Sequence, residues 1–180
     1  MKRTIKLVAA LLVILCAVSS LSACTSGKPS VKKGTKADKQ ENIIGSAEDI
    51  MRTYWFEYTI NSAETAESAG SLVPAEGNVF VKLDTTFTNI SDSELQINSR
   101  EFICYYATEE NSYTTCLTAS DIEGLMPETI TLQPEESATY ALIYEIPAST
   151  QRVEIGFVEY FANDTYGDKF YVDIALEEKK

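Results

Sequence analysis

Apolar and polar residues alternate strictly in the middle of the chain. Between residues 79 and 87, every second position carries Val, Val, Leu, Thr or Phe, and mostly polar residues lie between them. A period of two is that of a β-strand with one buried face. Asn89, Ser91, Asp92 and Ser93 follow and predict a turn, after which Leu95 and Ile97 restart the alternation. Such a strand needs paired neighbours and an apolar layer beneath it, so it predicts an antiparallel sheet.

Similar short apolar runs occupy most of the rest of the chain. They lie at residues 54–60, 101–106, 113–118, 129–132, 140–146, 153–157 and 170–176, with turn residues between them. Ser120 to Glu123 has capping-box spacing, but Gly124 and Pro127 follow, so we expect at most one helical turn there. The pattern predicts seven to eight strands in an all-β, antiparallel β-sandwich with Greek-key connections.

The first 23 residues have the organisation of a secretory signal. Three cations within the first six residues precede an apolar run from Leu7 to Val18 that is too short to span a bilayer comfortably. The following Leu21-Ser22-Ala23-Cys24 resembles the bacterial lipobox, which implies diacylglyceryl transfer to Cys24 and cleavage before it. The alternative is a plain signal peptide cut near Ala23, which would leave a free thiol. The lipobox places the protein on the extracytoplasmic face of a bacterial cell membrane, anchored by lipid.

A polar segment separates this signal from the apolar runs. Residues 24–49 carry Ser, Gly, Pro, Lys and Gln with few apolar residues, and we interpret them as a flexible, lipid-anchored tether. The lysines of its first part either lie on anionic lipid headgroups or are simply solvated. The folded domain is then expected at residues 50–177.

Charge and composition exclude several functions. The 180 residues carry a net charge of −12 and contain no histidine. An acidic chain with few cations is a poor nucleic-acid binder. Without imidazole, a Ser or Cys nucleophile lacks its usual base, and Lys82 and Lys169 have no companion motif for a lysine dyad. We therefore expect no enzyme, no cofactor and no metal site.

Paired carboxylates are the remaining candidates for chemistry. Asp164 with Asp168, and Glu135 with Glu136, could serve a glycosidase or bind calcium. Both pairs lie in predicted turns, where acidic residues are frequent for structural reasons, so we favour a structural role.

Cys104 and Cys116 remain once Cys16 and Cys24 are assigned to the signal and the lipid. A three-residue loop at residues 109–111 would place the two opposite each other across a hairpin, which favours a disulfide outside the cytoplasm. The alternative is a pair of buried free thiols.

Tyrosines supply a further candidate surface. They either form a binding face or fill the core with their hydroxyl groups at its rim. The candidates are Tyr105, Tyr106, Tyr113, Tyr140, Tyr144 and Tyr160.

Three motifs resemble those of a known family. Thr88-Asn89-Ile90-Ser91, the run Leu132 to Ser137 (LQPEES) and Glu145-Ile146-Pro147 are similar to the pattern of an uncharacterised immunoglobulin-like domain of Gram-positive lipoproteins, itself similar in fold to a mycobacterial immunoprotective extracellular antigen. Glu135 stands where that family usually has Gly. The resemblance covers roughly residues 54–176 and implies an immunoglobulin-like sandwich without a catalytic set.

These observations predict a lipid-anchored binding or protein-interaction module. Its expected partners are the membrane, through the lipid on Cys24, and an envelope or extracellular protein or ligand. The alternative is a structural or accessory protein of the cell envelope, and an envelope hydrolase is a remote third. An interaction module should expose an aromatic or apolar patch, whereas an enzyme should show a closed polar cleft.

Overall fold

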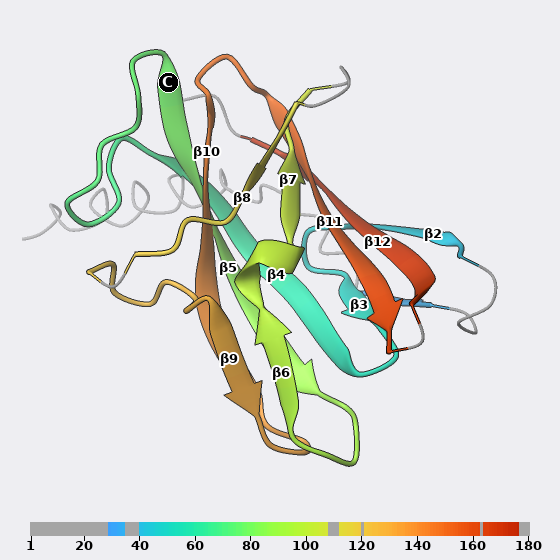
Figure 1. Cartoon of the computed structure of the whole chain (residues 1–180). Helices are drawn as coiled ribbons and strands as arrows, with labels where there is room; N and C mark the ends of the chain where they lie inside the picture. The colour runs from blue at the N-terminus through green and yellow to red at the C-terminus, as the bar shows by residue number, and fades with distance from the viewer. Residues whose placement is uncertain (1–28, 35–39, 108–111, 120, 163, 177–180) are drawn as a thin grey trace, which may run out of the picture.

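The computed structural model describes residues 29–34, 40–107, 112–119, 121–162 and 164–176. These residues form twelve strands and a single turn of 3-10 helix (Figure 1). The strands are β1 (Val31–Lys33), β2 (Asn42–Ser46), β3 (Ile50–Arg52), β4 (Phe56–Ala66), β5 (Asn78–Asn89), β6 (Leu95–Asn98), β7 (Ile103–Tyr105), β8 (Tyr113–Thr115), β9 (Thr129–Leu132), β10 (Ser137–Pro147), β11 (Arg152–Phe161) and β12 (Thr165–Ala175). The helical turn, η1 (Ser99–Glu101), lies between β6 and β7.

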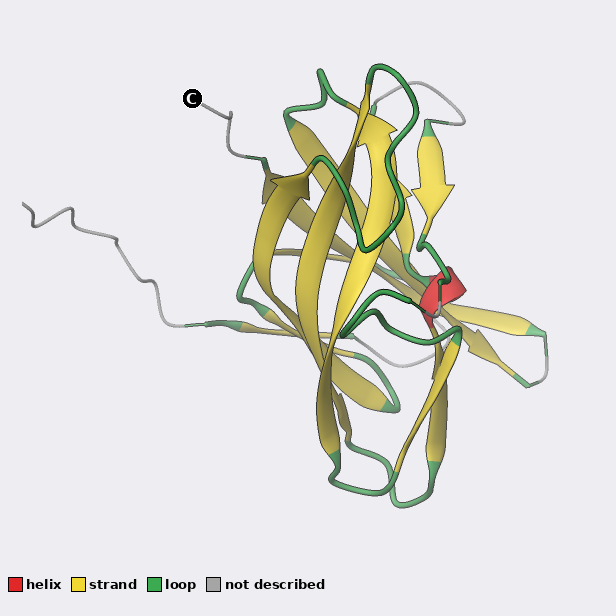
Figure 2. Cartoon of the chain, turned by 90° about the vertical axis from the view of Figure 1, so that its left-hand side faces the viewer, coloured by secondary structure: helices red, strands yellow, loops and turns green. Residues whose placement is uncertain are grey.

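Two five-stranded sheets and a small third sheet form a β-sandwich, which confirms the predicted fold class. The first sheet has the order β1-β3-β4-β5-β10, the second has the order β2-β12-β11-β7-β8, and β6 pairs with β9. Figure 2 shows that strands make up most of the described chain. Pairing is antiparallel throughout the interior, and the two parallel pairs, β1 with β3 and β2 with β12, lie at sheet edges. Three of the additional strands beyond the predicted seven to eight, β1, β2 and β3, precede the first predicted run at residues 54–60.

The core lies between the two large sheets and is organised around β5. Val81, Leu83 and Phe87 point inward from β5 and are fully buried, as the alternation predicts. Phe102 stacks on Phe157 of the second sheet at a centroid distance of 5.1 Å. Burying these apolar side chains is the main favourable contribution to folding.

One buried tyrosine is anchored and another is not. The hydroxyl of Tyr144 donates to the main-chain oxygen of Phe102 at 3.0 Å. The hydroxyl of Tyr58 is buried and has no hydrogen-bond partner among the described residues. Tyr144 therefore fills the core, as one interpretation of the tyrosines predicted, but its hydroxyl is buried there and does not lie at the rim.

The predicted tether is wrong where β1 and β2 lie. Both strands fall within residues 24–49, yet they extend the edges of the first and second sheets. Ile43 packs against the core, and Gly45 lies so close to Met51 that an added Cβ would be 2.6 Å from its sulfur. Polar residues surround these few apolar positions, so composition alone indicated a tether.

At most one helical turn was expected near Ser120, and the residues described there form no helix. Ser120 itself lies outside the described residues, and Asp121 to Gly124 form bends and turns. The helical turn that does form is η1, where the side chain of Asn98 accepts from the main-chain N–H of Arg100 at 2.9 Å. Within the described residues, no helix is long and apolar enough to cross a membrane.

Candidate binding face

Three tyrosines cluster on the outer face of the second sheet. Tyr105 of β7 lies directly opposite Tyr113 of β8, and its ring centroid is 6.1 Å from that of Tyr113 and 6.4 Å from that of Tyr171 of β12. Gly156 of β11 makes this approach possible, because a Cβ there would lie 2.8 Å from Cε2 of Tyr105 and 3.2 Å from Cε1 of Tyr171. The missing side chain lets the two rings close over the strand.

An open depression of about 1050 Å³ adjoins this cluster, between the β7–β8 edge and the β10–β11 turn. We call it the tyrosine groove. Its lining combines tyrosine rings, small polar residues of the turn and charged residues of β11 and β12. The lining residues are Tyr105, Tyr106, Ala107, Ser112, Tyr113, Pro147, Ser149, Thr150, Gln151, Arg152, Val153, Glu154 and Asp173.

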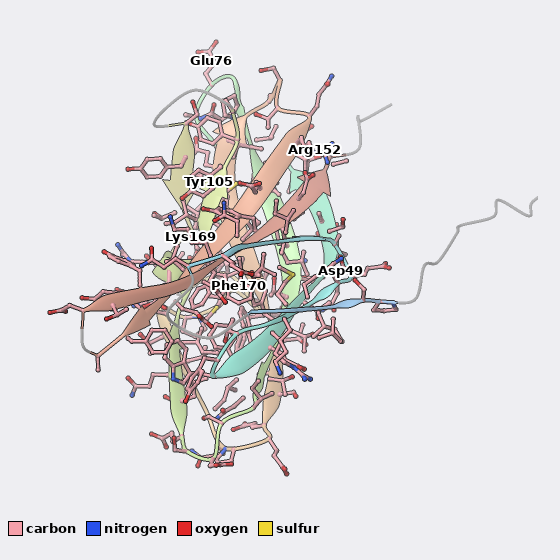
Figure 3. All side chains as sticks on the ribbon, turned by 90° about the vertical axis from the view of Figure 1, so that its right-hand side faces the viewer. Asp49, Glu76, Tyr105, Arg152, Lys169 and Phe170 are labelled. Carbon is pink, nitrogen blue, oxygen red and sulfur yellow. The ribbon has the colours of Figure 1, made fainter. Side chains whose placement is uncertain are left out.

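Exposure of the rings makes this groove a candidate for binding. Tyr113 is 50% exposed and Tyr105 is 36% exposed. In Figure 3, Tyr105 and Arg152 both lie in the upper half of the view, and Lys169 lies below them. Exposed tyrosines beside an open groove are the feature that an interaction module was expected to show.

The charged groups of the groove are unevenly paired. Arg152 donates from Nε and Nη2 to the two carboxylate oxygens of Asp173, and these bonds lower the pKa of Asp173. Glu154 lies opposite both Tyr105 and Asp173 in the strand register. Among the described residues, its carboxylate has no hydrogen bond or ion pair. Its pKa is raised, first by desolvation and then by the negative charge of Asp173.

A second exposed aromatic cluster lies at the end of the β11–β12 hairpin. Tyr160 and Tyr166, each more than half exposed, approach to 5.2 Å between ring centroids. Nearby, Trp55 and Phe161 approach to 4.8 Å. We call these residues, with Tyr54, the aromatic tip.

Buried Glu159 holds the aromatic tip together. Its Oε1 accepts from the main-chain N–H of Tyr54 at 2.7 Å, and its Oε2 accepts from that of Asp168 at 3.1 Å. Burial raises the pKa of this carboxyl, against the effect of the two hydrogen bonds. Gly167 leaves room for it, because a Cβ there would lie 2.5 Å from Oε2.

The predicted hairpin geometry of the cysteines is wrong. Thr114, not Cys116, lies opposite Cys104, so the two cysteines are diagonal neighbours rather than direct partners. Both are buried free thiols, and the bridge is absent from the structure. Burial raises the pKa of Cys104 to about 12 and that of Cys116 to about 11.

The candidate carboxylate pairs have structural roles. Asp168 is buried, and its Oδ1 accepts from the main-chain N–H of Glu41 at 2.8 Å. Asp164 accepts from the hydroxyl of Tyr160. Glu136 accepts from the main-chain N–H of Gln133 at 2.7 Å, within the turn that also contains Glu135.

The remaining candidates for chemistry are scattered. Lys82 forms ion pairs with Glu64 at 3.2 Å and Asp84 at 3.6 Å on the first sheet, far in the fold from the groove. Lys169 lies on β12. In the part of the chain that the structure describes, no three His, Cys, Asp or Glu side chains gather as a metal site would require. Cys24 lies outside the described residues.

Sequence reasoning found part of the groove. It singled out Tyr105, Tyr106 and Tyr113, which the structure brings together. It missed Glu154 and Gly156, because only the register shows that they face the tyrosines. An interior strand glycine is the signal that could have found the site, since it marks a close approach.

Comparisons with known proteins agree with this fold. Residues 46–169 match the model of a family described as a domain of unknown function (DUF4352). The fold is similar to that of the Bacillus subtilis protein ycdA, described as a candidate lipoprotein, with a TM-score of 0.59 and 11% identity over 72% of this chain and 39% of that one. The yjhA protein of Bacillus subtilis is similar with a TM-score of 0.58 and 13% identity over 74% of this chain and 99% of that one. The comparison with curated proteins gave no match.

Proposed function

The chain belongs to the DUF4352 family of domains of unknown function, and from that premise we propose that it is a lipid-anchored extracytoplasmic module that binds a partner protein or ligand in the tyrosine groove. The groove carries the proposal, because the rings of Tyr105 and Tyr113 line it and are exposed. Large aromatic side chains at a surface are the usual anchors of binding interfaces.

The anchor is proposed from Cys24 and its lipobox-like surroundings, and the description of ycdA as a candidate lipoprotein supports it. Because β1 begins at Val31, only six residues separate it from Cys24. Fully extended, six residues span about 20 Å, which would hold the sandwich close to the membrane. The module would then meet partners at the bilayer surface rather than deep in a cell wall.

We propose no catalysis. The chain has no histidine, and the groove is open rather than a closed polar cleft. Among its described lining residues, the candidate hydroxyl nucleophiles are tyrosine, serine and threonine side chains, and the chain supplies no imidazole base. Purified protein should therefore give no turnover on esterase, peptidase or glycosidase substrates.

Affinity capture from envelope extract tests the binding role. The bait is the full-length protein, and its variant carries Tyr105→Ser with Tyr113→Ser. The matched control carries Tyr160→Ser with Tyr166→Ser, which removes two exposed tyrosines from the aromatic tip. We expect capture to be lost in the first variant and kept in the control. Equal capture by all three proteins would refute binding in the groove and favour an accessory envelope role.

A separate experiment tests the anchor. Cys24→Ala should block lipidation, so that the precursor persists or is released from the membrane. Intact-mass measurement of the membrane fraction tests lipidation. An unmodified Cys24 on the mature wild-type protein would contradict the lipid anchor, and it would not bear on binding in the groove.

A further inference from the structure

Glu154 is the one groove acid that the fold leaves without a cation among the described residues. Arg152, two residues away on the same strand, has both Nε and Nη2 directed to Asp173. Glu154 is partly buried and faces Tyr105 on one side and Asp173 on the other. A desolvated carboxylate beside a like charge is held in an unfavourable state that an opposite charge would relieve.

The tyrosine rings next to this carboxylate also favour a cation. Tyr105, Tyr113 and Glu154 line the same groove, and the rings of the two tyrosines meet at a tilt of 53°. The face of an aromatic ring carries negative potential and attracts ammonium or guanidinium groups. Two aromatic rings and a carboxylate that line one open groove supply the groups that bind a positive charge.

We propose that the groove binds an arginine or lysine side chain of a partner polypeptide, whose charged group contacts Tyr105 and Tyr113 and pairs with Glu154. This inference rests on the proposed function, in which the groove is the binding surface. It adds the chemistry of the partner.

Other occupants fit the groove less well. An anion would meet two carboxylates, and the nearby cation of Arg152 is already paired. An apolar side chain would bury the carboxylate of Glu154 without a partner, which is costly. Lys169 does not line the groove, so it does not supply the missing charge there. The acidic chain, with a net charge of −12, would also attract a basic partner at long range.

The test uses a fluorescent Gly-Ser peptide that carries three arginines, and the same peptide with citrulline, which keeps the shape and removes the charge. Binding to the full-length protein is followed by anisotropy. We expect the citrulline peptide to bind at least about tenfold more weakly. Glu154→Gln should weaken arginine-peptide binding by about three- to tenfold, and Tyr105→Leu by about two- to fivefold.

Asp92→Asn is the matched control. It removes one negative charge from the exposed β5–β6 turn, which lies at the other end of the sandwich from β7 and β8 (Figure 1). It should leave binding unchanged within about twofold, because only long-range attraction is altered. A melting curve for each variant shows whether the fold is kept.

Two results would overturn the inference: equal binding of the citrulline peptide, or equal effects of Glu154→Gln and Asp92→Asn. Partner capture separates the inference from the proposal beneath it. If capture depends on Tyr105 and Tyr113 but not on Glu154, the groove binds and the cationic partner is wrong. If capture depends on none of the three, both are wrong.

Discussion

The side-chain amide of Asn89, at the end of β5, donates a hydrogen bond to the main-chain oxygen of Leu132, the last residue of β9, at 3.0 Å. It also donates to the main-chain oxygen of Ser93 at 2.8 Å, and Oδ1 accepts from Ser91. The main chain of Asn89 bonds to the turn that follows Leu132, accepting from Glu135 N–H at 3.1 Å. Two of the three motifs that resemble the family pattern, residues 88–91 and 132–137, are therefore one structural unit.

Replacing Asn89 by Asp should destabilise the fold. The carboxylate cannot donate to the two carbonyl oxygens, and it would place a buried charge beside them. We expect a loss of about 2–4 kcal/mol in the free energy of unfolding, measured by urea denaturation. Asn61→Asp is the control, because Asn61 is exposed and its side-chain amide donates to the hydroxyl of Thr86 at 2.9 Å. Equal losses in both variants would contradict the role assigned to Asn89.

Glu135→Gly should stabilise the protein. Glu135 has φ of 64°, a left-handed conformation that costs a residue with a side chain about 1 kcal/mol and glycine almost nothing. Allowing for the greater entropy of unfolded glycine, we expect a gain of about 0.5 kcal/mol. Glu136→Gly should instead destabilise, since Glu136 accepts a hydrogen bond from Gln133. A lower midpoint of urea unfolding for Glu135→Gly would refute the assignment of strain.

The thiols of Cys104 and Cys116 should react only when the protein unfolds. Both are buried, and their pKa values are raised from about 9 to about 12 and about 11. At pH 8 they are thus protonated in the folded state and shielded from iodoacetamide. After unfolding without reductant, peptide mass analysis should find both alkylated. Recovery of a peptide in which they are bridged would restore the disulfide hypothesis.

The same shifts predict how stability depends on pH. A thiol whose pKa is raised by folding favours the folded state below its unfolded pKa, near 9. That contribution disappears as the pH rises toward the folded values of about 11 to 12. A Cys104→Ser, Cys116→Ser variant should therefore lose less stability than the wild type between pH 9 and 11, measured by thermal unfolding.

The sequence predicts a structural feature well when that feature depends on neighbouring residues, and poorly when it depends on pairing with distant strands. The strict alternation around Leu83 and Phe87 reports burial directly, so the central strand and the sandwich were predicted correctly. Register is set by distant pairing, so sequence reasoning placed Cys116 opposite Cys104 and did not connect Glu154 with Tyr105. The short edge strand β2 carries few apolar residues and owes its place to β12, which composition cannot reveal.

Removing β1 and β2 should weaken the domain and expose the edges that they cover. A chain that begins at Ile50, where the tether was predicted to end, lacks both strands. It loses the five register pairs of β2 with β12 and the partly buried side chain of Ile43. We expect its free energy of unfolding to be about 1–3 kcal/mol lower than that of a chain that begins at Pro29. Burial of one aliphatic side chain, such as that of Ile43, contributes about this much to stability.

The exposed edge of β12 should also promote association of the shorter chain, since an unpaired strand edge is a template for another chain. Urea denaturation measures the first effect, and light scattering across a concentration series measures the second. The longer chain, which keeps both strands, is the control in each measurement. Equal stability and equal monomeric mass would mean that β1 and β2 neither stabilise the sandwich nor protect its edges from association. In that case the length of free chain between Cys24 and the domain would again be that of the predicted tether.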